Sequence, residues 1–156
     1  MTVDQPEMVT LAAARSWLRQ QVDRGAVCPC CSQKAKVYKR PMNSGIARAL
    51  ITMFRAAGTD WLYKPAVLKG VGSAARDESI ARYWGVIEEE LTVRLDGGRA
   101  GWWRVTPKGA DWVRGHTTLP RYARIYDGRC LGFVGPDVGI RTALGSRFNL
   151  DDLMSR

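Results

Sequence analysis

The sequence predicts an α+β protein, in which amphipathic helices alternate with pairs of short strands. Apolar residues recur at helical spacing across residues 7–24 and again across residues 43–58. Two strand-like segments, 87–95 and 102–105, flank a glycine-rich turn, and glycine reaches the positive φ that tight turns need. With 156 residues, 46% of them hydrophobic, the chain can form one domain with small appendages.

The N-terminal part is expected to hold one helix and a cysteine loop. The helix spans residues 7–24, and segment 26–42 is a compact loop or a small strand pair around Cys-Pro-Cys-Cys. A second helix begins at Asn43 or Ser44, since either side chain can accept the free amide hydrogens of a first turn. Gly58 is expected to end that helix.

The middle of the chain alternates short elements. In order, we expect a strand at 61–63, a short helix at 66–69, a helix at 73–84, the two strands named above, and a helix from Thr106 to about Arg114. Trp102 and Trp103 are neighbours on one strand, so one of them must face outward.

The C-terminal part is expected to begin with a hairpin. Asp127-Gly128 is a strong two-residue turn signal between strands 121–126 and 129–134. A short helix or turn at 137–144 and a final segment at 149–154 follow.

The composition favours a polyanionic partner. The net charge is +9, and the pI is about 9.8, which points to nucleic acid before a membrane. No apolar run approaches the length of a membrane helix, and the N-terminus does not resemble a secretory signal. We therefore expect an intracellular protein.

The central segment resembles the second half of a winged helix-turn-helix domain. The pieces that carry the likeness are Ala81-Arg82-Tyr83-Trp84-Gly85-Val86-Ile87-Glu88 and Trp103-Arg104-Val105-Thr106-Pro107-Lys108-Gly109. The resemblance implies a winged-helix domain at 43–115, preceded by the helix and cysteine loop of 1–42 and followed by a hairpin and tail, 116–156, packed on the core. It also implies that the protein binds double-stranded DNA.

The resemblance places the DNA contacts on helix 73–84, on the wing and before the helix. The residues concerned are Arg76, Ser79 and Arg82 on the helix, Arg94 and Arg99 on the wing, and Lys64 and Lys69 before the helix. Asp77 and Glu78 lie on the same helix and would repel phosphates. Winged helices also serve as protein-interaction modules, so an adaptor or inhibitor that docks on a host protein is the alternative.

The whole chain, over about residues 27–154, resembles a family of small uncharacterised tailed-phage proteins with an N-terminal Cys-Pro-x-Cys loop. The likeness is carried by Lys36-Val37-Tyr38-Lys39-Arg40, Asn43-Ser44-Gly45-Ile46-Ala47-Arg48-Ala49-Leu50, Pro120-Arg121-Tyr122 and Tyr126-Asp127-Gly128, among other pieces. It implies a regulator of phage or host gene expression that acts in the cytoplasm of a bacterial host.

The cysteines suggest a structural zinc ion. Cys28 and Cys31 form a Cys-x-x-Cys pair, whose sulfurs can reach one ion. A structural site needs four ligands, and the best set adds His116 and Cys130. Reduced structural thiols and a redox pair are the alternatives.

Enzyme motifs are absent. There is no Walker loop, no dinucleotide fingerprint and no His-Glu-x-x-His sequence, so we do not expect an enzyme. The helix at 7–24 could pair two copies into a homodimer, or it could pack on its own chain.

Overall fold

The computed structural model describes residues 9–71, 73–92 and 101–155. These residues form a mixed α+β fold with seven helices and three small antiparallel sheets, so the expected α+β class is confirmed. The chain divides into two compact units. The first unit is Met1–Arg40 with Arg124–Gly132, and the second unit is Pro41–Ala123 with Phe133–Arg156.

The first unit begins with helix α1, Leu11–Gln21. The Thr10 hydroxyl accepts a hydrogen bond from the Ala13 amide at 3.2 Å, which caps the helix. The helix ends before residue 24, the expected end. Strands β1, Ala26–Val27, and β2, Lys34–Ala35, then form an antiparallel pair, which is the small strand pair expected around the cysteines.

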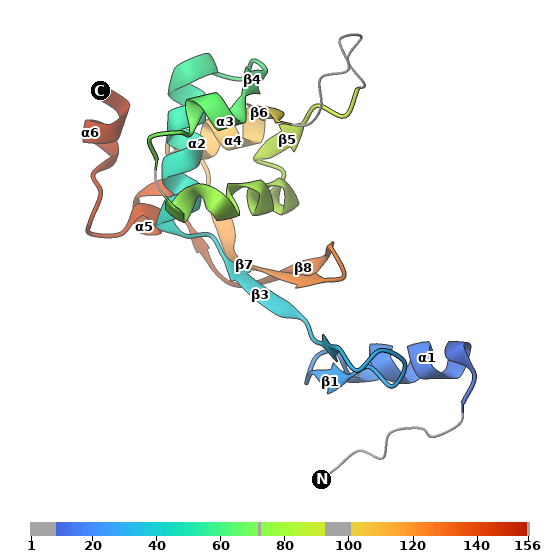
Figure 1. Ribbon diagram of the computed structural model, residues 1–156. Coiled ribbons are helices and arrows are strands. Elements are labelled where there is room, and N and C mark those ends of the chain that lie inside the picture. The colour runs from blue at the N-terminus through green and yellow to red at the C-terminus, as the bar shows by residue number, and fades with distance from the viewer. Residues whose placement is uncertain (1–8, 72, 93–100, 156) are drawn as a thin grey trace. The chain divides into compact units, whose positions relative to one another are not determined.

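The second unit is built around helix α2, Ser44–Ala57. Its apolar face is buried through Ile46, Leu50 and Met53, and it contacts helices α4, Pro107–Val113, and α5, Ile140–Leu144 (Figure 1). Both expected ends are confirmed: the Asn43 side chain caps the first turn, and Gly58 ends the helix.

The middle elements of the second unit follow the expected order. Strand β4, Leu62–Tyr63, leads into the short helix α3, Lys64–Val67, which begins two residues earlier than expected and holds Pro65 in its first turn. A 3₁₀ helix, η1, spans Ser73–Trp84, as expected for this segment. Strands β5, Ile87–Glu89, and β6, Trp102–Val105, complete a three-stranded sheet in the order β4-β6-β5.

The register of this sheet places large apolar side chains opposite each other. Leu62 lies opposite Trp103, and Ile87 lies opposite Val105. These four side chains are buried, so one face of the sheet belongs to the core. Strand β5 ends at Glu89, so the strand expected at 87–95 is shorter than predicted: residues 90–92 are described and do not continue it, and residues 93–95 lie outside the described ranges.

A third sheet joins one early strand to two late strands, and two helices follow it. Strands β3, Tyr38–Pro41, β7, Leu119–Tyr126, and β8, Arg129–Val138, form a sheet in the order β3-β7-β8. Strand β8 is longer than expected, because it continues through Pro136 instead of stopping there. Helix α5 and the final helix α6, Leu150–Ser155, both contact α2 within the second unit.

Two buried tryptophans form hydrogen bonds with strands β7 and β8. The indole N–H of Trp84 donates to the Pro120 carbonyl at 2.7 Å, and that of Trp112 donates to the Val138 carbonyl at 3.1 Å. A buried indole needs such an acceptor, because an unpaired N–H in the core would be destabilising. Among the described residues, no helix is long and apolar enough to cross a membrane.

Replacing Asn43 with alanine should lower the free energy of unfolding by about 1 kcal/mol. The substitution removes the acceptor at 2.9 Å from the Ile46 amide, at the start of the central helix. Urea denaturation followed by tryptophan fluorescence measures the loss. Thr10→Ala is the matched control, because it removes the same kind of cap from α1, in the other unit. An unchanged stability of Asn43→Ala would show that this cap contributes nothing.

Candidate functional site

Helix η1 lies against α2, the central helix of the second unit (Figure 1). A 3₁₀ helix has about three residues per turn, so side chains three apart share a face. Glu78, Ala81 and Trp84 follow this spacing, and all three are buried. The row displaced by one position faces outward, with Ser79 half-buried and Arg82 exposed. The helix therefore has one face in the core and one face that is turned outward.

The core face of η1 contains an internal ion pair. The Lys64 ammonium lies 2.7 Å from Glu78 Oε1, and the two side chains are only 13% and 9% exposed. The same ammonium lies 4.3 Å from the centre of the Trp103 ring, where the ring's negative face attracts a cation. Lys64 therefore has an internal role, and we leave it out of the DNA contacts proposed below.

The ion pair also changes the expected effect of Glu78 on a phosphate partner. A carboxylate on the partner face would repel phosphates, but this one is buried and faces an ammonium. Its second oxygen, Oε2, has no hydrogen-bond partner among the described residues. The negative charge of Glu78 is thus compensated inside the unit.

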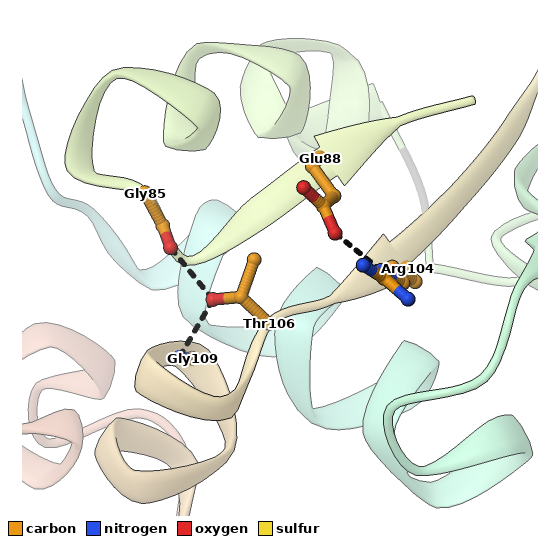
Figure 2. Close-up of polar contacts among 5 residues, drawn as sticks. All are labelled: Gly85, Glu88, Arg104, Thr106 and Gly109. Atoms are coloured by element: carbon orange, nitrogen blue, oxygen red, sulfur yellow. Dashed lines mark hydrogen bonds and ion pairs between the residues drawn. The ribbon is translucent and has the colours of Figure 1, made fainter. Parts of the chain in front are cut away.

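The turn after η1 is joined to the start of α4 by one threonine, as Figure 2 shows. The Thr106 hydroxyl donates to the Gly85 carbonyl at 2.6 Å and accepts from the Gly109 amide at 3.1 Å. The Thr106 amide donates to the Val86 carbonyl at 3.0 Å. These bonds connect the turn at the end of η1 to the segment that joins β6 to α4.

The outer side of the same sheet carries a second ion pair. Arg104 Nε and Glu88 Oε1 face each other across β5 and β6, where the two residues are register partners (Figure 2). Both side chains are more than a third exposed, so the pair adds little to stability. The pair occupies Arg104 with an acidic partner.

An aromatic face lies beside that pair, formed by Trp61, Tyr63 and Trp102. The rings of Tyr63 and Trp102 have centroids 5.8 Å apart, and Arg104 lies 4.5 Å from the centre of the Trp61 ring. Trp103 is buried while Trp102 is on the outer side, which confirms that one of the two tryptophans faces outward. Trp61 and Trp102, with Glu90 and Thr92, line an open cavity of about 350 Å³.

The expected DNA contacts are described only in part. Arg82 is exposed on η1, with its guanidinium 5.0 Å from the centre of the Tyr83 ring, and Lys69 is exposed in the turn after α3. Arg76 lies in η1, but its side chain is outside the description. Arg94 and Arg99, the expected wing contacts, lie outside the described residues.

The cysteine pair lies in the turn of the β1–β2 hairpin. The Cys28 amide donates to the Gln33 carbonyl at 2.7 Å, and the Ser32 amide donates back to the Cys28 carbonyl at 2.9 Å. Ser32 has a φ of 61°, which lets the chain reverse directly after Cys31. These two bonds hold the backbone of the turn between Cys28 and Gln33.

Donors in this turn stabilise the thiolate form of Cys28. Hydrogen bonds from the Cys30 amide, the Cys31 amide and the Cys31 thiol lower the pKa of Cys28, against a smaller opposing effect of burial. Cys28 is half-buried, whereas Cys30 and Cys31 are exposed. Two sulfurs that share one hydrogen-bonded turn are suited to a soft metal ion.

Of the remaining expected zinc ligands, Cys130 does not form a group with this pair. Cys130 belongs to the first unit, and its thiol donates to the Gly132 carbonyl at 3.5 Å. His116 belongs to the second unit. Within the described ranges, no three side chains of histidine, cysteine, aspartate or glutamate form a group that could hold a metal ion.

The chain matches no protein-family model, no curated protein and no solved structure. The assignment of function therefore depends on the geometry described above.

Proposed function

We propose that this protein binds double-stranded DNA through the outward face of η1, in the manner of a winged helix. One observation carries the proposal: the elements follow in the order α2, β4, α3, η1, β5, β6, and their strands form a sheet in the order β4-β6-β5. A winged helix has this succession, with its third helix presented to the major groove and the segment between its last two strands forming the wing.

Support for η1 as the helix that enters the major groove comes from its two faces, of which only one is buried. Ala81 and Trp84 anchor it, whereas Arg82 and Ser79 remain on the outer row. Continuing the three-residue spacing backwards leads to Arg76, so we retain Arg76 as a proposed base contact. Arginine can make two hydrogen bonds to guanine in the major groove.

The charge distribution supports the same face. The net charge of +9 attracts phosphates, and the acidic Glu78 is neutralised by Lys64 inside the unit. Lys69 lies shortly before η1 and is exposed, as a phosphate contact must be. Arg94 and Arg99 complete the proposal as wing contacts.

The biological role that we propose is regulation of phage or host gene expression in the bacterial cytoplasm. This part rests on the resemblance to tailed-phage proteins, not on the geometry of the site.

The double variant Arg82→Ala/Lys69→Ala should bind random duplex DNA about tenfold or more weakly than the wild type at low salt, because two phosphate contacts are lost. The slope of log affinity against log salt should fall by about 2. Fluorescence anisotropy of a labelled duplex at several salt concentrations measures both quantities.

The matched control is Arg141→Ala/Arg147→Ala, which removes the same charge from the segment around α5. It should reduce binding much less than the first variant. Equal losses in the two variants would mean that binding depends on overall charge alone, and would reject η1 as the docking face.

A protein partner is the second candidate, and the aromatic face favours it. Tyr63 is 45% exposed, and Leu91, close to this face in sequence, is 82% exposed. A contiguous patch of exposed apolar side chains is typical of binding surfaces. Wild-type protein that shows no duplex binding at low salt, but captures one host protein that Tyr63→Ala fails to capture, would select this candidate.

A further inference from the structure

A cavity of about 710 Å³ lies within the first unit, and every residue that lines it belongs to that unit. Its walls come from α1, the cysteine turn, β2, Tyr38 and the β7–β8 turn. The Val37 amide donates to the Val22 carbonyl at 2.9 Å, and Arg124 forms an ion pair with Asp23, so α1 is joined to both neighbouring walls. The volume is within the range of about 300–1,000 Å³ that is usual for ligand pockets.

The walls of this cavity are basic. Arg15 and Arg19 are four residues apart on α1, which places them on one face of the helix. Lys34 and Lys36 come from the strand side of the cavity, and all four cations are exposed. Against them stands one carboxylate among the described lining residues, that of Asp127. The cavity therefore attracts an anion.

Between the cations the lining is apolar and aromatic. Leu18 and Tyr126 are half-buried, whereas Tyr38 is 47% exposed. The Lys36 ammonium lies 5.4 Å from the centre of the Tyr38 ring, and the Arg40 guanidinium lies 5.7 Å from it. A planar group that stacks on Tyr38 would bring an attached phosphate close to these two cations.

We infer that this cavity binds a single-stranded nucleic acid, with a base stacked on Tyr38 and phosphates held by the surrounding cations. A basic groove combined with an exposed aromatic ring is how proteins hold single strands without reading their sequence. A duplex does not fit this description, because its bases are stacked on each other and hide their flat faces. The inference concerns the first unit and does not depend on duplex binding through η1.

An acidic peptide is the other polyanion that the four cations would attract. It carries no planar bases, so its binding would not need the Tyr38 ring. The contribution of that ring to affinity therefore distinguishes the two ligands.

The first test measures binding of a single strand and its dependence on the ring. A labelled oligothymidine of about 15 nucleotides is titrated with the full-length protein at low salt, and fluorescence anisotropy is followed. Reducing conditions are used, because Cys28, Cys30 and Cys31 also line the cavity. Tyr38→Ala should bind about tenfold or more weakly than the wild type, and Tyr38→Phe should bind like the wild type, since the ring alone provides the stacking.

A wild type that does not bind the strand at low salt would overturn the inference. So would a Tyr38→Ala variant of unchanged affinity, or a glutamate-rich peptide that displaces the strand from the wild type but not from Tyr38→Ala. The wild-type titration and Tyr38→Phe keep the test decisive even if Tyr38→Ala fails to fold.

A charge variant tests the walls of the cavity. Lys34→Ala/Lys36→Ala should reduce the slope of log affinity against log salt by about 1.4, because each phosphate contact on a single strand contributes about 0.7. The matched control, Arg82→Ala/Lys69→Ala, removes the same charge from the second unit and should bind the strand much as the wild type does. Equal losses in the two variants would assign single-strand binding to overall charge and reject this cavity as the site.

Discussion

Replacing Lys64 with methionine is expected to lower the free energy of unfolding by about 3–5 kcal/mol. The change leaves the Glu78 carboxylate buried without its partner, and an uncompensated buried charge is strongly destabilising. The wild-type pair is 2.7 Å apart, and both side chains are almost fully buried. Urea denaturation measures the loss.

Two further variants separate the charge effect from the loss of packing. Lys64→Met/Glu78→Leu removes both charges, and its stability should return to within about 1–2 kcal/mol of the wild type, because a buried pair can often be replaced by apolar residues at little cost. Lys69→Met, on the exposed turn nearby, should change stability by less than about 0.5 kcal/mol. If Lys64→Met were as stable as the wild type but bound DNA more weakly, Lys64 would be a phosphate contact after all.

Replacing Gly109 with alanine should cost about 3 kcal/mol, the upper end of what overpacking a core typically costs. A Cβ at this position would lie 2.1 Å from the Val86 carbonyl oxygen and 2.8 Å from Val105 Cγ1. The Val86 oxygen cannot retreat freely, since it accepts the Thr106 amide hydrogen. The small gain in helix propensity from alanine does not offset this clash.

Thermal unfolding followed by circular dichroism measures the effect of Gly109→Ala, and a chain of this size should lose about 6–12 °C in Tm. Gly70→Ala is the control, because a Cβ there would meet nothing within 4 Å. A Gly109→Ala protein with the wild-type Tm would show that α4 can move away from β5. The junction in Figure 2 would then not be rigid.

The sequence was informative where local signals determine structure. The Asn43 cap and Gly58 mark the ends of α2, and the strand expected at 61–63 is found as β4. Trp102 and Trp103 are neighbours on one strand, so alternation requires that they face opposite sides of the sheet. Only Trp103 is buried.

Features that depend on tertiary contacts were beyond sequence reasoning. Lys64 and Glu78 belong to different helices, and nothing in their spacing indicates that they meet. The inclusion of β3 in the sheet with β7 and β8 joins segments about eighty residues apart. The position of the Cys130 thiol against Gly132 likewise follows from the path of β8, not from any cysteine motif.

The most direct test of DNA binding through η1 is a map of amide signals. Labelled protein is titrated with a short random duplex, and the chemical shifts of backbone amides are followed by NMR. We expect the largest changes in η1, around Ser79 and Arg82, and in the turn at Lys69. DNA binding through η1 would be contradicted if no amide signals shifted at low salt, or if the changes were confined to the aromatic face at Tyr63 and Trp102.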